Sequence, residues 1–354
     1  MRRVPEPPRR SGLRRTTGVG ALAALLLAIP LGAAPAAASQ APAATPPQAV
    51  TSAPAGTPAP VDEGAEVASA AAVRLNGHWG PFTRCPVDAP AMLAADGQAT
   101  VATCVSSKSP GGSIKLGKVT ATTGANDLQF GVVQDTKAGT FTVVPPAGGA
   151  VVGAPTEIPG GLLGLMCPGD IPVVTDICKL LTDNVLNRVT ATVESAGAPT
   201  EFNLAAGLTS GKQIVKLPVR IRLQNPFLGS QCFIGSAADP IVLRPQNTTA
   251  PTLAVQRFDG EGTPNTAGSM LRFALTGNSQ GDSAFAVPKA NGCGLLGVLN
   301  GAIDLKTGLP SPAGNNHLTL GGAATHSAGL TAPGLVRPDA GKVLARNWHS
   351  AVLP

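Results

Sequence analysis

The sequence predicts a mainly β protein, a β-sandwich or partly open barrel with a few short helices, stapled by disulfides. Three observations lead to this fold class. Apolar and polar residues alternate with a period of two in many short stretches, which is typical of half-buried strands. The chain contains 43 Gly and 34 Pro, which favour frequent turns over long helices. Its six cysteines, an even number, follow a segment of the kind that directs export.

The N-terminus has the layout of a secretory signal. Basic residues in "MRRVPEPPRRSGLRR" precede an apolar run at 19–31 and the small residues "AAAS" at 36–39. The run is too short for a comfortable membrane span. We therefore expect residues 1–38 to be a signal peptide, cleaved near Ala38, and the mature protein to be secreted and extracellular, without a transmembrane anchor. The pair Arg14-Arg15 leaves twin-arginine export open beside general secretion.

The next segment, residues 39–72, consists largely of Ala, Pro, Thr and Ser. Such a composition cannot bury enough apolar surface to offset the entropy of ordering, so it predicts a disordered linker. The folded part then covers residues 73–354. We divide it into a first β subdomain, 73–160, and a second, 161–354, with one continuous unit as the alternative.

The charge balance disfavours a nucleic-acid partner. Six of the 26 basic and one of the 20 acidic residues precede residue 39, which leaves 20 basic and 19 acidic residues after it. A nearly neutral chain lacks the basic surface that binds nucleic acid. With nine Phe, two Trp and no Tyr, it also has few rings for stacking on bases or sugars.

The clearest strand is "IVKLPVRIRL" at 214–223, in which apolar residues occupy every second position. Pro218 lies inside it and predicts an edge strand or a bulge, because proline cannot donate to a sheet ladder. Further strands are predicted by the same alternation at 128–132, 140–144, 189–193, 202–204, 271–275 and 285–287.

Three segments have helical spacing. The best is 172–186, a weaker one runs over 295–303 with two internal glycines, and a third follows Asp339 in "AGKVLARNW". We expect these helices to flank a β core.

The cysteines are predicted to be structural. They are Cys85, Cys104, Cys167, Cys178, Cys232 and Cys293. Fifteen pairings are open, and proximity alone favours pairing sequence neighbours, in the order written. A metal site is disfavoured because the chain has no Cys-x-x-Cys pair and no histidine near its cysteines. We expect no cofactor.

The motif Cys-Pro-x-Asp-x-Pro occurs twice, at 85–90 and 167–172. We interpret each copy as a disulfide cysteine, a tight turn and a helix start. Asp88 and Asp170 would then be the helix caps, since aspartate is a preferred N-cap and proline is tolerated in a first turn. Whether the two copies reflect a duplication stays open.

One stretch invites comparison with serine hydrolases, "GDSAF" at 281–285. A nucleophilic Ser283 would need a histidine within hydrogen-bond reach, and the downstream candidates are His317, His326 and His349. No Gly-rich oxyanion loop accompanies it, so a turn capped by Asp282 is the favoured reading.

Two other motifs have structural explanations. Asn247-Thr248-Thr249 fits a glycosylation sequon, and we interpret it as a turn. Gly-Leu-Leu-Gly occurs at 161–164 and 294–297. If exposed, these pieces would mark a protein or lipid contact; the favoured interpretation is that they pack beneath Cys167 and Cys293 as core.

The phrases "PGGLLGLMCPGDIP", "LPVRIRLQNPFLGSQCFIGS" and "LKTGLPSPAGNN" resemble uncharacterised secreted proteins of high-GC actinobacteria. The resemblance covers most of residues 73–354 and implies no activity. We therefore expect a secreted, non-catalytic extracellular or cell-envelope-associated protein, a binding or structural module for an unknown protein or cell-wall component. The alternative is a secreted serine hydrolase using Ser283 with a distant histidine.

Overall fold

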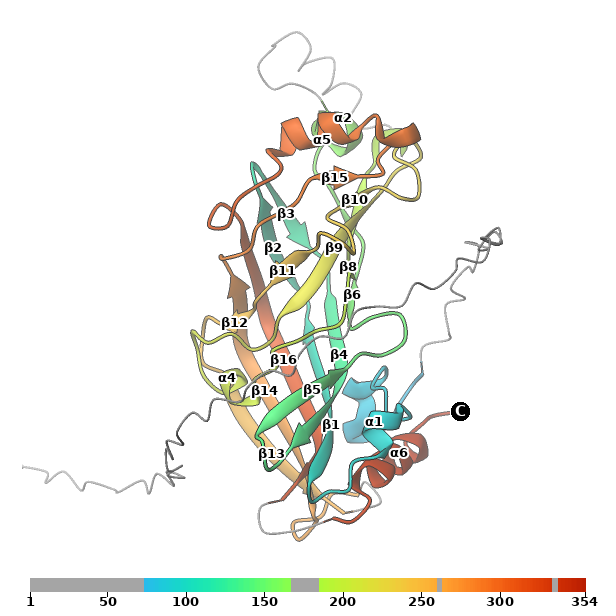
Figure 1. The fold of residues 1–354 in the computed structure, drawn as a ribbon, viewed down its shortest axis with the longest axis vertical. Helices are drawn as coiled ribbons and strands as arrows, with labels where there is room; N and C mark the ends of the chain where they lie inside the picture. The colour runs from blue at the N-terminus through green and yellow to red at the C-terminus, as the bar shows by residue number, and fades with distance from the viewer. Residues whose placement is uncertain (1–72, 167–184, 260–262, 333–336) are drawn as a thin grey trace, which may run out of the picture. The chain divides into compact units, whose positions relative to one another are not determined.

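The computed structural model describes residues 73–166, 185–259, 263–332 and 337–354 (Figure 1). The predicted signal peptide and linker lie outside these residues. So do Cys167, Asp170, Cys178 and most of the best predicted helix, 172–186.

A single large antiparallel sheet dominates the described residues, and it is not closed into a barrel. Its main path runs β12-β14-β16-β1-β4-β6-β8-β9-β10-β15, with β11 beside β9, β13 beside β14, the β2–β3 hairpin beside β16, β5 beside β4 and β7 beside β8. The strands are β1 Thr100–Ser109, β2 Gly111–Leu116, β3 Val119–Thr123, β4 Asn126–Asp135, β5 Thr140–Val144, β6 Val151–Gly153, β7 Thr156–Glu157, β8 Thr190–Ser195, β9 Leu217–Gln224, β10 Phe233–Ile234, β11 Ile241–Leu243, β12 Gln246–Asn247, β13 Thr252–Phe258, β14 Met270–Asp282, β15 Ala290–Asn291 and β16 His317–Thr331. The mainly β prediction is confirmed.

Short helices flank the sheet. They are η1 Gly77–Phe82, α1 Pro90–Leu93, α2 Gly161–Met166, η2 Val185–Asn187, α4 Leu204–Gly207, η3 Leu295–Gly297, α5 Asn300–Thr307 and α6 Ala340–Ser350, of which η1 to η3 are 3-10 helices. The predicted strand at 202–204 was wrong, because Asn203 instead caps α4 by accepting a hydrogen bond from the Ala206 N–H at 3.0 Å.

Strands from both predicted subdomains share this sheet. β1 and β4, from the first, pair with β16 and β6, and β6 pairs in turn with β8 of the second. The described residues, from 73 onward, accordingly belong to one compact unit.

Strand β9 shows the predicted alternation but not the predicted edge. Its alternate residues from Leu217 to Leu223 are buried. It lies between β8 on one side and β11 on the other, with Pro218 opposite Val242 of β11. Strand β8 ends at Ser195, which pairs with Val219, so Pro218 lies just beyond the ladder between β8 and β9. The missing N–H of Pro218 therefore breaks no hydrogen bond to β8, while its carbonyl accepts from the Ala196 N–H at 2.9 Å.

The strands at the centre of the sheet are covered on both faces. On β1, Val105 packs in the larger hydrophobic core and lines a cavity, whereas Ala102 and Cys104 pack in a second core. We call the face of the sheet that carries Val105 the inner face, and the face that carries Ala102 and Cys104 the outer face. The outer face is covered by η1, α1 and α6. There the Trp348 indole N–H donates to the Phe82 carbonyl at 2.7 Å.

Two of the three predicted disulfides lie within the described residues, and both have the predicted partners. Cys85 bonds Cys104, and Cys232 bonds Cys293. The first bond ties the turn before α1 to β1.

The cap predicted at Asp88 was wrong. Helix α1 begins one residue later than expected, with Ala89 in the N-cap position and Pro90 as its first residue. The Asp88 carboxylate is therefore out of reach of the first turn, and it accepts instead from His349 Nε2 at 2.8 Å. Asp339 does precede α6, but its side chain bonds the Lys342 ammonium rather than the helix N–H groups.

Candidate functional site: a series of apolar cavities

The inner face of the sheet encloses three neighbouring apolar cavities. Cavity 1, of about 140 Å³, lies between α4 and strands β1, β4, β12, β14 and β16. Cavity 2, of about 80 Å³, lies between β2, β4, β8, β9, β11 and β16. Cavity 3, of about 60 Å³, continues between β2, β3, β8 and β9 as far as α2 and α5.

Neighbouring cavities share walls. Leu128 and Pro245 line both cavity 1 and cavity 2, while Val193 and Ile221 line both cavity 2 and cavity 3. The three cavities therefore form one elongated apolar series along the inner face, which begins at α4 and ends beneath α2 and α5.

A short irregular segment completes the wall of this series. Ile241–Leu243, as β11, pairs with β9, and Gln246–Asn247, as β12, pairs with β14. Pro245, between them, accepts from the Ile214 N–H at 3.0 Å and lines cavities 1 and 2. The segment thus spans from one part of the sheet to another and separates the cavities from solvent.

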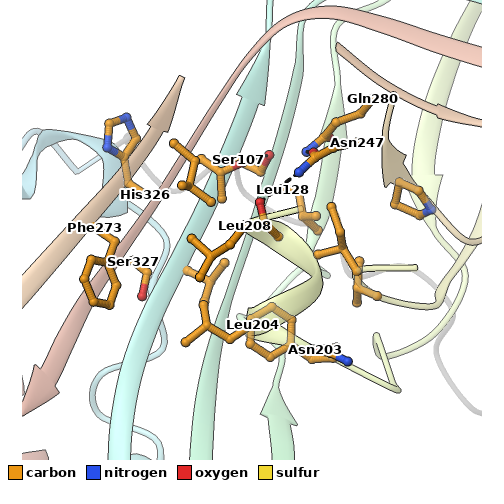
Figure 2. Close-up of a pocket in the computed structure, with 18 of the residues that line it drawn as sticks. Ser107, Leu128, Asn203, Leu204, Leu208, Asn247, Phe273, Gln280, His326 and Ser327 are labelled. Carbon is orange, nitrogen blue, oxygen red and sulfur yellow. Dashed lines mark hydrogen bonds between the residues drawn. The ribbon is translucent and has the colours of Figure 1, made fainter. Parts of the chain in front are cut away.

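The main polar feature of cavity 1 is an amide cluster of Asn247, Asn278 and Gln280; Asn247 and Gln280 are labelled in Figure 2. The Asn247 amide nitrogen donates to the carbonyls of Gly207 and Thr209, at 2.8 and 3.0 Å, which fixes its orientation. Its Oδ1 must then be an acceptor, and Asn278 Nδ2 donates to it at 2.7 Å.

This network leaves one buried acceptor unused. Because Asn278 donates through its nitrogen, its Oδ1 points elsewhere, and this atom has no hydrogen-bond partner among the described residues. Asn278 is only 1% exposed. A buried carbonyl without a donor costs about 1–3 kcal/mol, so Asn278, a lining residue of cavity 1, carries a buried acceptor that is left unsatisfied.

The cavity series contains no side chain with a formal charge. None of the residues that line the three cavities is Asp, Glu, Lys or Arg. His326 borders cavity 1 with its backbone; its ring points away from the apolar side chains and lies on the outer face, 6.4 Å from the ring of Phe82 (Figure 2). An ionised group inside would have no counter-charge, so the site selects uncharged molecules.

Cavity 1 meets solvent between α4 and β13. Leu208 and Leu253 line the cavity, and about half of each side chain remains exposed. These two leucines mark its mouth.

The structure does not join the predicted hydrolase residues. Ser283 is exposed and follows the end of β14. The Asp282 carboxylate accepts from the Arg244 and Ala284 N–H groups, which is the capped turn that the sequence favoured. His317 precedes Leu318, which pairs with Asp282, so it is the histidine nearest to Ser283 in the strand register. Its ring bonds the Thr319 hydroxyl at 2.9 Å, and within the described residues no histidine bonds Ser283.

Two histidines lie on the outer face beside Arg272. An Arg272 Nη1 donates to the His78 carbonyl at 2.9 Å. Burial lowers the pKa of His78 and of His326, and the positive charge of Arg272 lowers the pKa of each further. These imidazoles are therefore held in their neutral form, on the side of the sheet opposite the cavities.

The residue that organises the site was misread in the sequence. Asn247 looked like an exposed turn in a glycosylation sequon, but it is 1% exposed and is the centre of the amide cluster. The interpretation as a turn was wrong for Asn247, because Gln246–Asn247 form β12; the exposed Thr248 and Thr249 that follow do form a bend. The only available signal was the flanking alternation, which is too short to identify a strand.

The described residues contain no group of three or more His, Cys, Asp or Glu placed to hold a metal ion. No helix in this part of the chain has both the length and the apolar composition to cross a bilayer. In comparisons with known proteins, no family model, curated protein or solved structure matches the chain.

Proposed function

We propose that this protein is an exported, non-catalytic binding protein that holds a slender, uncharged, apolar molecule in its cavity series. The observation that carries the proposal is the line of three apolar cavities, with the partnerless amide oxygen Asn278 Oδ1 on the polar side of cavity 1. Apolar pockets with a few placed polar groups are the usual form of small-molecule sites.

The size of the site supports a chain-like ligand. An apolar cavity of about 150 Å³ binds a molecule the size of benzene. Cavity 1 has about this volume, and cavities 2 and 3 extend it in one direction with smaller sections. A ligand that follows the series is therefore narrow, as an alkyl or isoprenoid chain is.

The unused acceptor specifies one polar group on the ligand. A hydroxyl or N–H would donate to Asn278 Oδ1 and remove the cost of its burial. A carboxylate or phosphate inside the cavity would bring a charge without a partner. The favoured ligand is thus a long-chain alcohol or a related neutral lipid.

The extracellular setting rests on different observations. Both disulfides in the described residues fit an oxidising compartment. The predicted signal peptide and the resemblance to secreted actinobacterial proteins agree with it. A secreted or cell-envelope-associated carrier would meet the neutral lipids of the envelope. The unknown cell-wall partner would then be a neutral lipid.

Fluorescence of N-phenylnaphthylamine, a neutral apolar probe with one N–H, tests the proposal. The protein recovered from the medium of an exporting host should enhance its emission, and decanol should displace it at lower concentration than decane or decanoate. Ser327→Leu should abolish the enhancement, because Ser327 lines cavity 1, its hydroxyl has no partner there, and the larger side chain fills the space.

Ser283→Ala serves as the control, since Ser283 is exposed and borders none of the three cavities. Equal displacement by decanoate, or unchanged binding in Ser327→Leu, would contradict the proposal. A fluorophosphonate label that disappears in Ser283→Ala would favour the serine hydrolase instead.

A further inference from the structure

We infer that the turn from η3 into α5 is a docking tip that inserts into the surface of a lipid bilayer. The tip consists of four apolar residues, Leu295, Leu296, Val298 and Leu305, which are between 72% and 97% exposed. Scattered single apolar residues are normal on a protein surface, whereas a contiguous group of this kind marks an interaction site.

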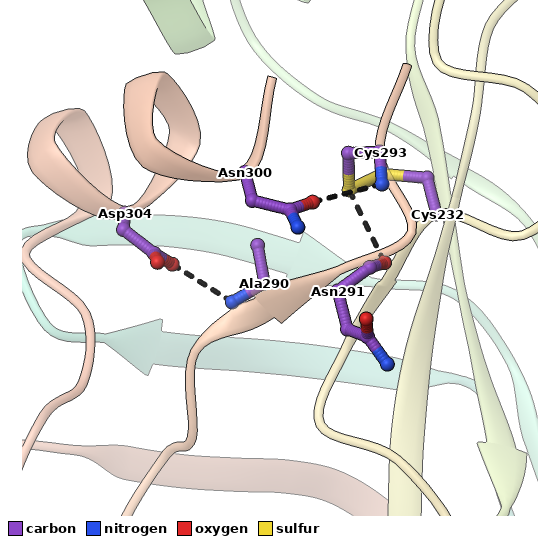
Figure 3. Close-up of a disulfide and its surroundings, with 6 residues drawn as sticks. All are labelled: Cys232, Ala290, Asn291, Cys293, Asn300 and Asp304. Carbon is purple, nitrogen blue, oxygen red and sulfur yellow. Dashed lines mark hydrogen bonds between the residues drawn. A yellow bond between two sulfur atoms is a disulfide. The ribbon is translucent and has the colours of Figure 1, made fainter. Parts of the chain in front are cut away.

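The base of the tip is rigid (Figure 3). The Cys232–Cys293 disulfide anchors the strand that leads into the turn. Asn300 Oδ1 accepts from the Cys293 N–H at 2.8 Å, and Asp304 Oδ1 accepts from the Ala290 N–H at 2.8 Å. These contacts fasten the start of α5 and the strand before it to the disulfide, and the leucines between them are exposed.

The backbone of the turn is strained at Leu296, and the side chain of this residue is exposed. Leu296 has a φ of 54°, in the left-handed region, between Gly294 and Gly297, whose φ values are 74° and 77°. A leucine in this conformation is less stable than a glycine, and asparagine tolerates it better. Leu296 recovers none of that cost through burial, so its exposed side chain points to an external partner.

The charges of the tip suit a lipid surface. Asp304 and Lys306 are its charged side chains within 295–307. The Asp304 carboxylate is only partly exposed and accepts from the Ala290 N–H. Within 295–307, therefore, no fully exposed carboxylate opposes approach to lipid phosphates, and Lys306 in the last turn of α5 favours it.

A bilayer fits better than a protein partner for two reasons. The side chains project almost completely from the surface, as insertion requires, whereas protein interfaces are broad patches of more moderately exposed residues. Helix α5 of the tip also borders the cavity series, since its Thr307 lines cavity 3 together with Leu165 of the neighbouring α2. This second reason rests on the proposed function: a lipid carrier would dock at the membrane that supplies its ligand.

Flotation with phosphatidylcholine vesicles, with and without phosphatidylglycerol, tests the inference. The exported protein should float with the vesicles, and the double variant Leu296→Asn, Leu305→Gln should bind about a hundredfold less, since each leucine that no longer inserts loses roughly tenfold or more. Asparagine suits the left-handed position and glutamine suits a helix, so the double variant should keep its fold. Val255→Thr is the matched control, because Val255 is 53% exposed on β13 and lines none of the three cavities.

Two further measurements separate the outcomes. Leu295→Trp should show a blue-shifted emission with vesicles that brominated lipids quench; Trp79 and Trp348 are buried and should not respond. Unchanged flotation of the double variant would overturn the inference. So would a wild-type dimer that this variant turns into a monomer, because the tip would then bind a second copy. Probe binding is expected to be unchanged in the double variant, so a protein that binds N-phenylnaphthylamine but not vesicles refutes the tip alone.

Discussion

The two faces of strands β1, β14 and β16 are packed in opposite ways. On the outer face, Trp79, Phe82 and Phe258 meet edge to face, with the Trp79 ring 6.0 and 5.8 Å from the other two. On the inner face, the same strands border cavities and a buried carbonyl without a donor. Because alternate residues of a strand point to opposite sides, one set of strands supplies stability on one face and binding space on the other.

The first way to test this division is to remove an aromatic ring from each face. Phe82→Ala should destabilise the fold by about 4 kcal/mol, because Phe82 is fully buried in the outer core. Phe273→Ala, on β14 beside cavity 1, should cost clearly less, since Phe273 is only half-buried and already borders empty space. Urea unfolding of both variants gives the two free energies, and equal losses would remove the distinction between the faces.

A second test exchanges binding for stability on the inner face. Asn278→Leu should raise the free energy of unfolding by about 1 kcal/mol, because it removes the partnerless Oδ1 while Gln280 Nε2 still donates to Asn247. The same change should weaken the binding of decanol but not of decane. Asn278→Asp, which buries a charge in nearly the same shape, should instead lower stability. If Asn278→Leu had a lower free energy of unfolding than the wild type, the unused acceptor would not be destabilising the fold.

A third test uses the histidines of the outer face. His78 and His326 have pKa values lowered by burial and by Arg272, so the unfolded chain binds more protons than the folded one below about pH 6.5. Stability is therefore complete above that pH, falls as the pH decreases through it, and levels off below the folded pKa values.

The measurement is the melting temperature between pH 8 and pH 5. The groups that act on these rings are Arg272 on both, Asp259 on His78 and Lys108 on His326. His78→Gln and His326→Gln should each flatten the dependence, while probe binding at pH 8 stays unchanged. A slope of the opposite sign would show that the imidazoles are protonated in the fold.

Sequence patterns predicted the strands better than the site, and the two Gly-Leu-Leu-Gly pieces show why. In 161–164, Leu162 is buried and packs in the larger core, while Cys167, beneath which this piece was expected to lie, is outside the described residues. In 294–297, Leu295 and Leu296 are exposed, so the same interpretation was wrong there. The two four-residue sequences are identical, yet their burial differs. The second one lies beside contacts of Cys293 with Cys232, which is distant in the chain, and with Asn300, which comes later, and the four residues themselves carry no sign of either contact.

Other parts of the fold were open to prediction for local reasons. Alternation identified β5 at its observed bounds and the core of β9, because a strand with one buried face records that face in its sequence. The cavity series and the amide cluster were not predictable, since they arise where strands far apart in sequence meet. Asn247 and Asn278, for example, are 31 residues apart.

The smallest expected effect compares two serines on opposite faces. Ser106, on the outer face, and Ser327, on the inner face, are both buried, and neither hydroxyl has a partner among the described residues. Ser106→Ala should stabilise the fold by about 0.5–1 kcal/mol, since it removes an unsatisfied group from a packed core. Ser327→Ala should gain only a few tenths, because it enlarges the empty space of cavity 1 and so loses part of what the removed hydroxyl returns. Precise melting curves of the two variants measure the difference. A larger gain at Ser327 would mean that enlarging cavity 1 has no such cost.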